Sequence, residues 1–298
     1  MEYSLFKEYV LEGIRERLGE DLDYEYRSVV KNNGIVLDGL LIRDKKSSIS
    51  PTVYVNDYYD SYVAGDELDQ ILDRIEDVYK ENTITDEFDA ERFCHFENIK
   101  DNVVYKIVNY EKNAELFKDI PHKKFLDLAI VYYINIKDDT FENASILINN
   151  NQLKVWGVDE IMIDELAKKN TPLIHKAEIK TMADTLIELM SSPDEETIDF
   201  LQSENSPMYV VSNEDKVFGA AVLLYDGLIR EFSKRVDSSV WIIPSSVHEL
   251  ILVPSVYVTD SSILDDMICE INATEVPGTD ILSNHAYYYD KKKDEIVY

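Results

Sequence analysis

The sequence predicts an α+β fold, in which a small N-terminal helix–antiparallel sheet–helix unit precedes a larger mixed α/β region. Residues 6–18 carry apolar side chains at three- and four-residue steps, which is the spacing of one helix face. Residues 22–30 alternate polar and apolar side chains, as a half-exposed strand does. Residues 126–136 are almost continuously apolar, as expected of a strand that is covered on both faces.

The N-terminal domain, an αββ(β)α unit, is predicted to span residues 1–84. Gly19 ends its first helix, because glycine readily adopts the left-handed conformation that closes helices. Asn33-Gly34 separates the first strand from a second strand at residues 35–43. This dipeptide favours a type I′ hairpin turn, since both central residues of that turn have positive φ.

A short third strand and a closing helix complete this unit. Residues 51–55 are expected to add an edge strand. Asp66 is expected to cap the helix that follows. The inner face of this helix carries apolar side chains at helical spacing, namely Leu68, Ile71, Leu72, Ile75, Val78 and Tyr79.

The middle mixed α/β domain is predicted to span residues 85–190. After its buried strand, residues 144–148 are expected to form a second, shorter strand. A helix at residues 159–169 is expected to stop at Asn170-Thr171-Pro172, because proline disrupts a helix interior. Another helix is expected at residues 179–190, where apolar residues recur at helical spacing.

Residues 191–206 are predicted to be an acidic linker, because they contain five acidic residues and no basic one. The C-terminal α+β domain is predicted to span residues 207–298, and the sequence leaves open whether it shares a core with the middle domain. Its expected strands are residues 208–212, 240–243, 250–253 and 286–289, and its expected helices are residues 228–236 and 263–271.

Composition and charge restrict the classes of function. The 298 residues carry 30 Lys and Arg against 59 Asp and Glu, which gives a net charge of −29. Such a field repels phosphate backbones and anionic membranes, so we expect no direct nucleic-acid binding and no membrane binding. Cys94 and Cys269 are too few for a disulfide framework, and the N-terminus lacks the basic segment of a signal peptide. A cytoplasmic location is therefore expected.

Six segments spread along the chain resemble a known family. They are residues 31–34 (KNNG), 49–52 (ISPT), 121–129 (PHKKFLDLA), 218–221 (FGAA), 244–249 (PSSVHE) and 271–276 (INATEV). Together they are similar to domain-of-unknown-function family 5688, which is found in anaerobic gut bacteria. The resemblance implies a bacterial cytosolic protein that is treated as one full-length unit, and it carries no established activity or catalytic residues.

Several common catalytic and cofactor motifs are missing from the sequence. It has no GxxxxGK(S/T) phosphate loop, no GxGxxG after a strand, no HExxH, no CxxC and no GxSxG. The five histidines are scattered, and no two of them lie three or four residues apart. We therefore expect no cofactor and no metal site.

Ser246, His248 and Glu249 are the candidate catalytic residues. They lie between two apolar strand-like runs, where a tight connection would place a hydroxyl, an imidazole and a carboxylate on one rim. His248 could then act as a base toward a hydroxyl, with a carboxylate fixing its tautomer. In the simpler alternative, the serine hydroxyls cap exposed amides of a turn and His248 bonds to the backbone.

The segment from Asp57 to Glu91 is unusual in composition, because its thirteen acidic residues are opposed only by Arg74 and Lys80. An almost entirely negative helix face attracts basic partners, and tyrosine favours interfaces because it buries area at low entropy cost. The simpler alternative is a solvated helix whose charge serves solubility and the helix dipole. The predicted partner-binding residues are Tyr54, Tyr58, Tyr59, Tyr62, Asp69, Asp73 and Asp77.

These observations favour a non-enzymatic, cytosolic interaction or regulatory protein. It is expected to bind a basic protein partner through its acidic, tyrosine-rich surface at residues 54–91, and its most specific form is an inhibitor that imitates the charge of a nucleic acid. One alternative is a hydrolase with a site near Ser246, His248 and Glu249. Another is a structural subunit whose acidic face serves solvation alone.

Overall fold

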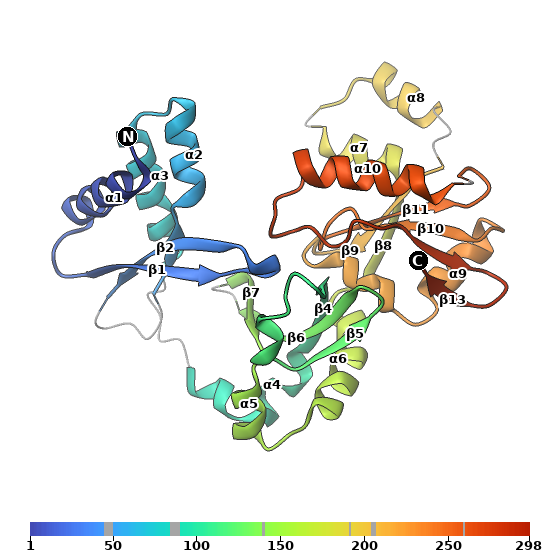
Figure 1. The fold of residues 1–298 in the computed structure, drawn as a ribbon, viewed down its shortest axis with the longest axis horizontal. Helices are drawn as coiled ribbons and strands as arrows, with labels where there is room; N and C mark the ends of the chain where they lie inside the picture. Colours follow the sequence, from blue (N-terminus) through green and yellow to red (C-terminus); the bar gives the residue numbers. More distant parts are fainter. Residues whose placement is uncertain (45–49, 84–89, 139–140, 191, 204–206, 259) are drawn as a thin grey trace. The chain divides into compact units, whose positions relative to one another are not determined.

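The computed structural model describes residues 1–44, 50–83, 90–138, 141–190, 192–203, 207–258 and 260–298. These residues form two units, Met1–Cys94 and His95–Tyr298 (Figure 1). Among the described residues, every pair of neighbouring strands is antiparallel, and helices accompany each sheet, as the predicted α+β class requires.

The N-terminal unit follows the predicted order of elements, with one additional helix. Its three strands form an antiparallel sheet in the order β1-β2-β3. The extra helix, α2, lies between the edge strand and the closing helix. The elements are α1 (Tyr3–Leu18), β1 (Asp23–Val30), β2 (Val36–Arg43), β3 (Thr52–Tyr54), α2 (Asn56–Ala64) and α3 (Leu68–Glu81).

The hairpin between β1 and β2 is confirmed, but the predicted two-residue turn is wrong. Val30 pairs with Val36, so residues 31–35 form a longer loop that the Lys31 amide closes by donating to the Ile35 carbonyl. Asn33 and Gly34 do have the positive φ expected of this dipeptide, 61° and 70°. They lie inside a turn of 3-10 helix, which accommodates the additional residues.

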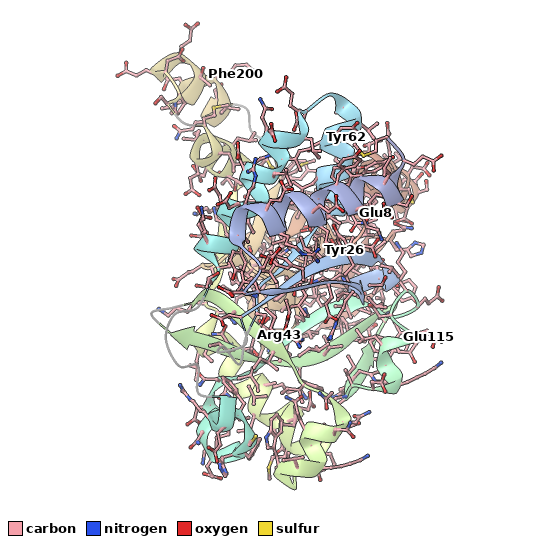
Figure 2. All side chains as sticks on the ribbon, turned by 90° about the vertical axis from the view of Figure 1, so that its left-hand side faces the viewer. Glu8, Tyr26, Arg43, Tyr62, Glu115 and Phe200 are labelled. Carbon is pink, nitrogen blue, oxygen red and sulfur yellow. The ribbon has the colours of Figure 1, made fainter. Side chains whose placement is uncertain are left out.

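The core of this unit lies between the sheet and the apolar faces of α1 and α3. Phe6, Val10 and Ile14 of α1 are fully buried, as are Ile71 and Ile75 of α3. Because these residues lie three or four positions apart, each helix presents one continuous apolar side to the sheet. In Figure 2, Tyr26 lies between the sheet and α1, and its hydroxyl donates to the Lys7 carbonyl.

The start of α3 differs from the prediction. Glu67, not Asp66, is the N-cap residue, and its side chain makes no capping hydrogen bond. The Asp66 carboxylate instead lies 2.6 Å from an Arg74 guanidinium nitrogen, an ion pair that draws the carboxylate away from the helix amides. Gly65, with φ of 117°, ends α2 immediately before this point.

The Asp38 carboxylate on β2 joins the sheet to α1. It accepts hydrogen bonds from the Lys7 ammonium at 2.9 Å, the Tyr3 hydroxyl at 3.0 Å and the Ser28 hydroxyl at 3.0 Å. The hydrogen bond from Lys7, aided by those from Ser28 and Tyr3, lowers the pKa of Asp38 from its ordinary 3.8. The folded state therefore favours the ionised carboxylate.

The second unit contains two antiparallel sheets. In the first, β6 pairs with β4 along one edge and with β5 and then β7 along the other. Strand β6 is buried on both faces, as its apolar run predicts. The elements up to this point are α4 (Phe96–Ile99), β4 (Val103–Asn109), β5 (His122–Phe125), β6 (Leu128–Asp138), β7 (Phe141–Leu147), α5 (Asn150–Trp156) and α6 (Glu160–Ile174).

The other sheet has the order β13-β12-β10-β11-β9-β8. Strand β8 falls within the predicted middle domain but pairs with β9 of the predicted C-terminal domain, so the two regions lie in one unit. The predicted linker contains helix α8. The elements are β8 (Ala177–Thr181), α7 (Met182–Leu189), α8 (Glu195–Ser203), β9 (Tyr209–Asn213), α9 (Leu228–Arg235), β10 (Val240–Ile243), β11 (Leu250–Pro254), α10 (Ser261–Thr274), β12 (Tyr287–Asp290) and β13 (Glu295–Val297).

Helix α6 continues through Pro172, so the predicted stop at residue 170 is wrong. The Asn170 side-chain amide donates to the Lys100 and Val103 carbonyls. The Thr171 hydroxyl donates to the Ala167 carbonyl. The tertiary contacts of Asn170 and the Thr171 bond within the helix hold the last turn in place, although proline removes one backbone donor.

Two further elements differ from the prediction. Residues 177–181 form β8 before helix α7 begins, and the Thr181 hydroxyl accepts the Asp184 amide at 3.1 Å as the helix cap. The C-terminal strand β13 was not predicted. It pairs with β12 through a charged turn in which Asp294 has φ of 56°, a conformation that the sequence alone does not indicate.

We expect Asp38→Asn to destabilise the N-terminal unit near neutral pH. Because the folded pKa is lowered, the contribution of Asp38 is complete above about pH 4 and is lost as the pH falls through the folded pKa. Urea unfolding of wild type and variant near neutral pH and at about pH 3 measures this difference. The gap in unfolding free energy should shrink in acid, whereas a gap independent of pH would contradict the assignment. Asp21→Asn, at an exposed turn, is the control.

Candidate functional site

The outer face of α3 carries four acidic residues spaced by four positions: Asp69, Asp73, Asp77 and Glu81. We call them the acidic stripe. All four are exposed, and the side chains of Asp69 and Asp73 are 89% and 66% accessible. Because residues four apart share a helix face, the four carboxylates follow one line along α3.

One cation from α1 lies against the start of the acidic stripe. The Arg17 guanidinium contacts the carboxylates of Asp69, Asp73 and Glu76 at 3.6, 2.5 and 3.5 Å. Lys80, on α3 itself, pairs with Glu76 at 2.5 Å. Two cations thus lie among five carboxylates, and this face of the N-terminal unit stays negative.

The predicted tyrosines lie elsewhere and are partly buried. Tyr59 packs edge-on against Tyr3 and Phe6, with ring centroids 4.9 and 5.3 Å away. Tyr62 also contacts Phe6, at 5.6 Å (Figure 2 labels Tyr62 on α2). These rings therefore pack onto the hydrophobic core, which explains their presence without a partner.

The two remaining tyrosines each lie under a cation of this unit. The Lys31 ammonium lies 4.0 Å from the centre of the Tyr54 ring, and the Arg74 guanidinium lies 5.6 Å from that of Tyr58. Burial raises the pKa of the Tyr58 hydroxyl. The structure thus brings the predicted acids together on one helix face and engages the predicted tyrosines in internal contacts.

Ser246, His248 and Glu249 lie in the connection between β10 and β11. The Ser246 hydroxyl accepts the backbone amide of His248 at 3.0 Å. The His248 ring accepts the Phe218 amide at Nδ1, 3.2 Å away, so its proton lies on Nε2, which is 3.9 Å from an Asp280 carboxylate oxygen. Across the described residues, no hydrogen bond joins the Ser246 hydroxyl to the His248 ring. A serine–histidine nucleophile is therefore not assembled here.

This loop is fastened to the neighbouring segment by close packing. The Ser212 hydroxyl donates to the His248 carbonyl at 2.7 Å, and the His248 ring stacks on Phe218 with centroids 5.7 Å apart. A Cβ on Gly219 would lie 2.3 Å from the His248 carbonyl oxygen, so only glycine fits. Residues 218–221 and 244–249, two of the segments that carry the family resemblance, thus contact each other. This packing gives both segments a structural role.

A buried polar chain that the sequence did not indicate lies next to this loop. The His175 Nδ1 atom is 2.6 Å from an Asp215 carboxylate oxygen, and its Nε2 atom is 3.3 Å from the Tyr133 hydroxyl. The arrangement resembles a proton relay, but His175 is only 5% exposed and so is closed to a substrate. No local sequence pattern indicates this chain, because Tyr133 and Asp215 each lie about forty positions from His175 in the sequence.

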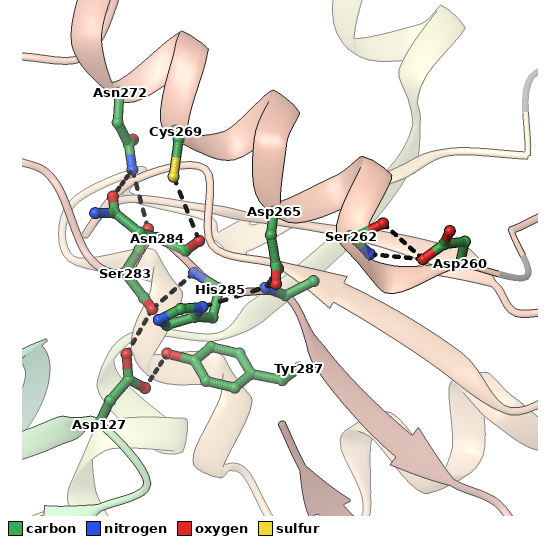
Figure 3. Close-up of polar contacts among 11 residues, drawn as sticks. Asp127, Asp260, Ser262, Asp265, Cys269, Asn272, Ser283, Asn284, His285 and Tyr287 are labelled. Carbon is green, nitrogen blue, oxygen red and sulfur yellow. Dashed lines mark hydrogen bonds and ion pairs between the residues drawn. The ribbon is translucent and has the colours of Figure 1, made fainter.

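Asp127 is the centre of a second polar cluster that the sequence did not indicate (Figure 3). Its carboxylate accepts hydrogen bonds from the Ser283 hydroxyl at 2.6 Å and from the Tyr287 hydroxyl at 2.7 Å. Ser283 and Tyr287 are both fully buried. Burial and the Asp127 carboxylate raise the pKa of the Tyr287 hydroxyl, so it remains a donor across the physiological range.

The same cluster continues onto α10. The Asn272 amide donates to the Ser283 carbonyl at 3.0 Å and to the Asn284 side chain at 2.9 Å. The Ala286 amide donates to Asp265 at 2.8 Å. Figure 3 shows these groups linking α10, through residues 283–287, to Asp127, so the cluster is a structural junction.

The described residues contain no group of three or more His, Cys, Asp or Glu side chains that could hold a metal ion. Both cysteines, Cys94 and Cys269, are exposed. In the part of the chain that the structure covers, no helix combines the length and the apolar character needed to cross a bilayer.

We expect Asp127 and Tyr287 to be energetically coupled. Asp127→Asn leaves the Ser283 and Tyr287 hydroxyls without a charged acceptor, and Tyr287→Phe removes one of the two donors. A double-mutant cycle should therefore give a coupling of about 0.5–3 kcal/mol in unfolding free energy. The control cycle pairs Asp127→Asn with Tyr289→Phe, whose hydroxyl bonds to Asp294. Equal coupling in both cycles would contradict the junction.

Comparison with known proteins gives one match. The model of a family described as a family of unknown function (DUF5688) matches residues 3–291. Neither a curated protein nor a solved structure matches the chain. Since the match covers almost the whole sequence, the protein belongs to the DUF5688 family.

Proposed function

We propose that this protein is a non-enzymatic interaction protein that binds a basic protein partner through the acidic stripe of α3. The observation that carries the proposal is the line of exposed carboxylates at Asp69, Asp73, Asp77 and Glu81. A basic surface complements such a line, and charge complementarity accelerates encounter and selects partners. We place the interaction in the bacterial cytoplasm, where the exposed cysteines fit a reducing environment.

Helix stability does not account for the stripe. Like charges four residues apart destabilise a helix by about 0.2–0.5 kcal/mol per pair. Asp69 lies in the first turn, where the helix dipole favours a negative charge, but Glu81 lies in the last turn, where the dipole disfavours it. Glu81 therefore opposes the dipole of the helix that carries it, which favours a role outside folding.

The tyrosines contribute less to this proposal than the acids. Tyr59 and Tyr62 pack onto the core, so their substitution would disturb the fold before it informed on a partner. The tests below therefore change only the acidic stripe.

We expect Asp77→Asn to stabilise the N-terminal unit. The substitution removes repulsion from two carboxylates, those of Asp73 and Glu81, and attraction to one ammonium group, that of Lys80, and it keeps the size of the side chain. The urea midpoint should therefore rise. Partner affinity should fall in the same variant, because the stripe loses one charge. A lower urea midpoint would contradict the view that the stripe opposes helix stability.

We expect reversal of the stripe to abolish partner binding more effectively than the same change of charge elsewhere. The test protein carries Asp69→Lys, Asp73→Lys and Asp77→Lys. The matched control carries Asp266→Lys, Glu270→Lys and Glu275→Lys, three exposed positions on or next to α10. A partner recovered from the source cytosol is purified and titrated against wild type, test and control at low and high salt.

The stripe variant should lose about tenfold or more in affinity, and the control should lose less than about threefold. Wild-type affinity should fall steeply with salt, because exposed charges are screened beyond about 8 Å at physiological ionic strength. Equal losses in the two variants would show that only net charge matters. Salt-independent binding would likewise overturn the proposal.

The hydrolase alternative at Ser246, His248 and Glu249 gains no support from the geometry. The Ser246 hydroxyl accepts a backbone amide, and the Ser245 hydroxyl lies 3.2 Å from a Glu249 carboxylate oxygen. These contacts are those of a capped turn.

A further inference from the structure

A pocket of about 360 Å³ lies in the second unit, between β5, β6 and α6, beside the 3-10 segment Gly219–Leu224. Its volume falls in the range of small-molecule sites. Phe125, Ile130, Pro172 and Leu224 form apolar walls. An apolar interior of this size favours a ligand with a hydrocarbon or aryl body.

The charged residues of the pocket are unusual for so acidic a protein. Lys123 and Lys168 share one carboxylate, since their ammonium groups lie 3.2 and 2.6 Å from the same Asp164 oxygen. Both ammonium side chains remain about half exposed, at 54% and 53%, whereas that of Asp164 is 16% exposed. Lys124 and Asp226, which also line the pocket, have opposite formal charges. The lining therefore carries one positive charge in excess, in a chain whose net charge is −29.

The wall of the pocket contributes a tyrosine hydroxyl that forms no hydrogen bond within the described residues. Tyr105 lines the pocket and is 2% exposed. Its ring contacts Tyr225, but no group in the described part of the chain forms a hydrogen bond with its hydroxyl. Burial raises the pKa of Tyr105, so this hydroxyl is a donor at neutral pH. Because this donor faces the pocket, an oxygen of a bound ligand can accept its hydrogen bond.

We propose that this pocket binds a small monocarboxylate with an apolar body, of the medium-chain alkyl or aryl class. The hydrocarbon part lies against Phe125 and Leu224, and the carboxylate meets Lys123 and Lys168. The Tyr105 hydroxyl supplies a donor for an oxygen of the ligand. A purely inorganic anion would leave the apolar walls unused, and an organic cation would be repelled by the lysines.

This site is independent of the acidic stripe, because it lies in the other unit and selects the opposite charge. It also gives a role to Lys123, a charged residue of the strand that pairs with β6. A loss of partner binding at the stripe and a loss of carboxylate binding at the pocket can therefore be observed separately.

Calorimetric titration of the full chain with octanoate tests the proposal. Octanol, which lacks the charge, and acetate, which lacks the apolar body, should each bind at least about tenfold more weakly than octanoate. Equal binding of octanol and octanoate would show an apolar cavity without charge selection. A lack of octanoate binding at millimolar concentration would overturn the proposal.

Three substitutions locate the site. Lys168→Gln leaves Asp164 to neutralise Lys123, so octanoate affinity should fall about tenfold. Asp164→Asn frees both lysines and keeps an acceptor for the Tyr132 hydroxyl, so affinity should rise. Tyr105→Phe keeps the packing and removes the donor, so affinity should fall about threefold or more.

Lys154→Gln, at an exposed position of α5, is the matched control and should leave affinity unchanged. Circular dichroism and thermal unfolding confirm that each variant is folded before titration. An Asp164→Asn variant that binds octanoate more weakly would contradict the assigned charge arrangement. Equal losses of octanoate affinity for Lys154→Gln and Lys168→Gln would show that general surface charge, and not this pocket, causes the effect. That result would contradict the proposed site.

Discussion

The hydrogen bonds that the Asp127 carboxylate accepts from Ser283 and Tyr287 are the contacts on which the second unit depends. They join the start of β6 to the beginning of β12, across more than 150 residues of chain. The Asp127 carboxylate is partly buried, and hydrogen bonds from hydroxyls to a charged acceptor are shorter and stronger than those between neutral groups. The two sheets are thereby fixed in one arrangement. The Asn109 amide adds to the junction by donating to the Leu282 carbonyl.

The same principle repeats elsewhere in the second unit. The Thr171 hydroxyl accepts the Tyr105 amide at 3.0 Å, and the Tyr225 hydroxyl donates to the His175 carbonyl at 2.5 Å. Each bond ties α6 or its end to a neighbouring element, and each lies in the protein interior. Loss of one partner would leave a buried polar group unsatisfied, which destabilises more than the bond itself contributes. Polar contacts thus specify how the apolar layers dock.

The local arrangement of charges matters for binding as well as the net charge of the chain. Exposed charges are screened over about 8 Å at physiological salt, so a partner senses the nearest few side chains more than the net −29. The acidic stripe and the lysine-lined pocket are therefore compatible in one chain. The stripe is exposed and suits a large basic surface, whereas the pocket is partly enclosed and apolar and suits a small anion.

The sequence alone determined the elements whose apolar residues repeat regularly, such as α1, β6 and α10, and it placed Asp69, Asp73 and Asp77 on one helix face. Local periodicity suffices there, because backbone geometry converts spacing into a shared face. Only the tertiary structure decided that Pro172 stays inside a helix, that Tyr59 and Tyr62 turn onto the core, and that Asp127 meets Tyr287. The pocket of Tyr105, Lys123 and Lys168 was also invisible in the sequence. Such groups are brought together by the packing of distant elements, and sequence spacing carries no information on which distant elements pack.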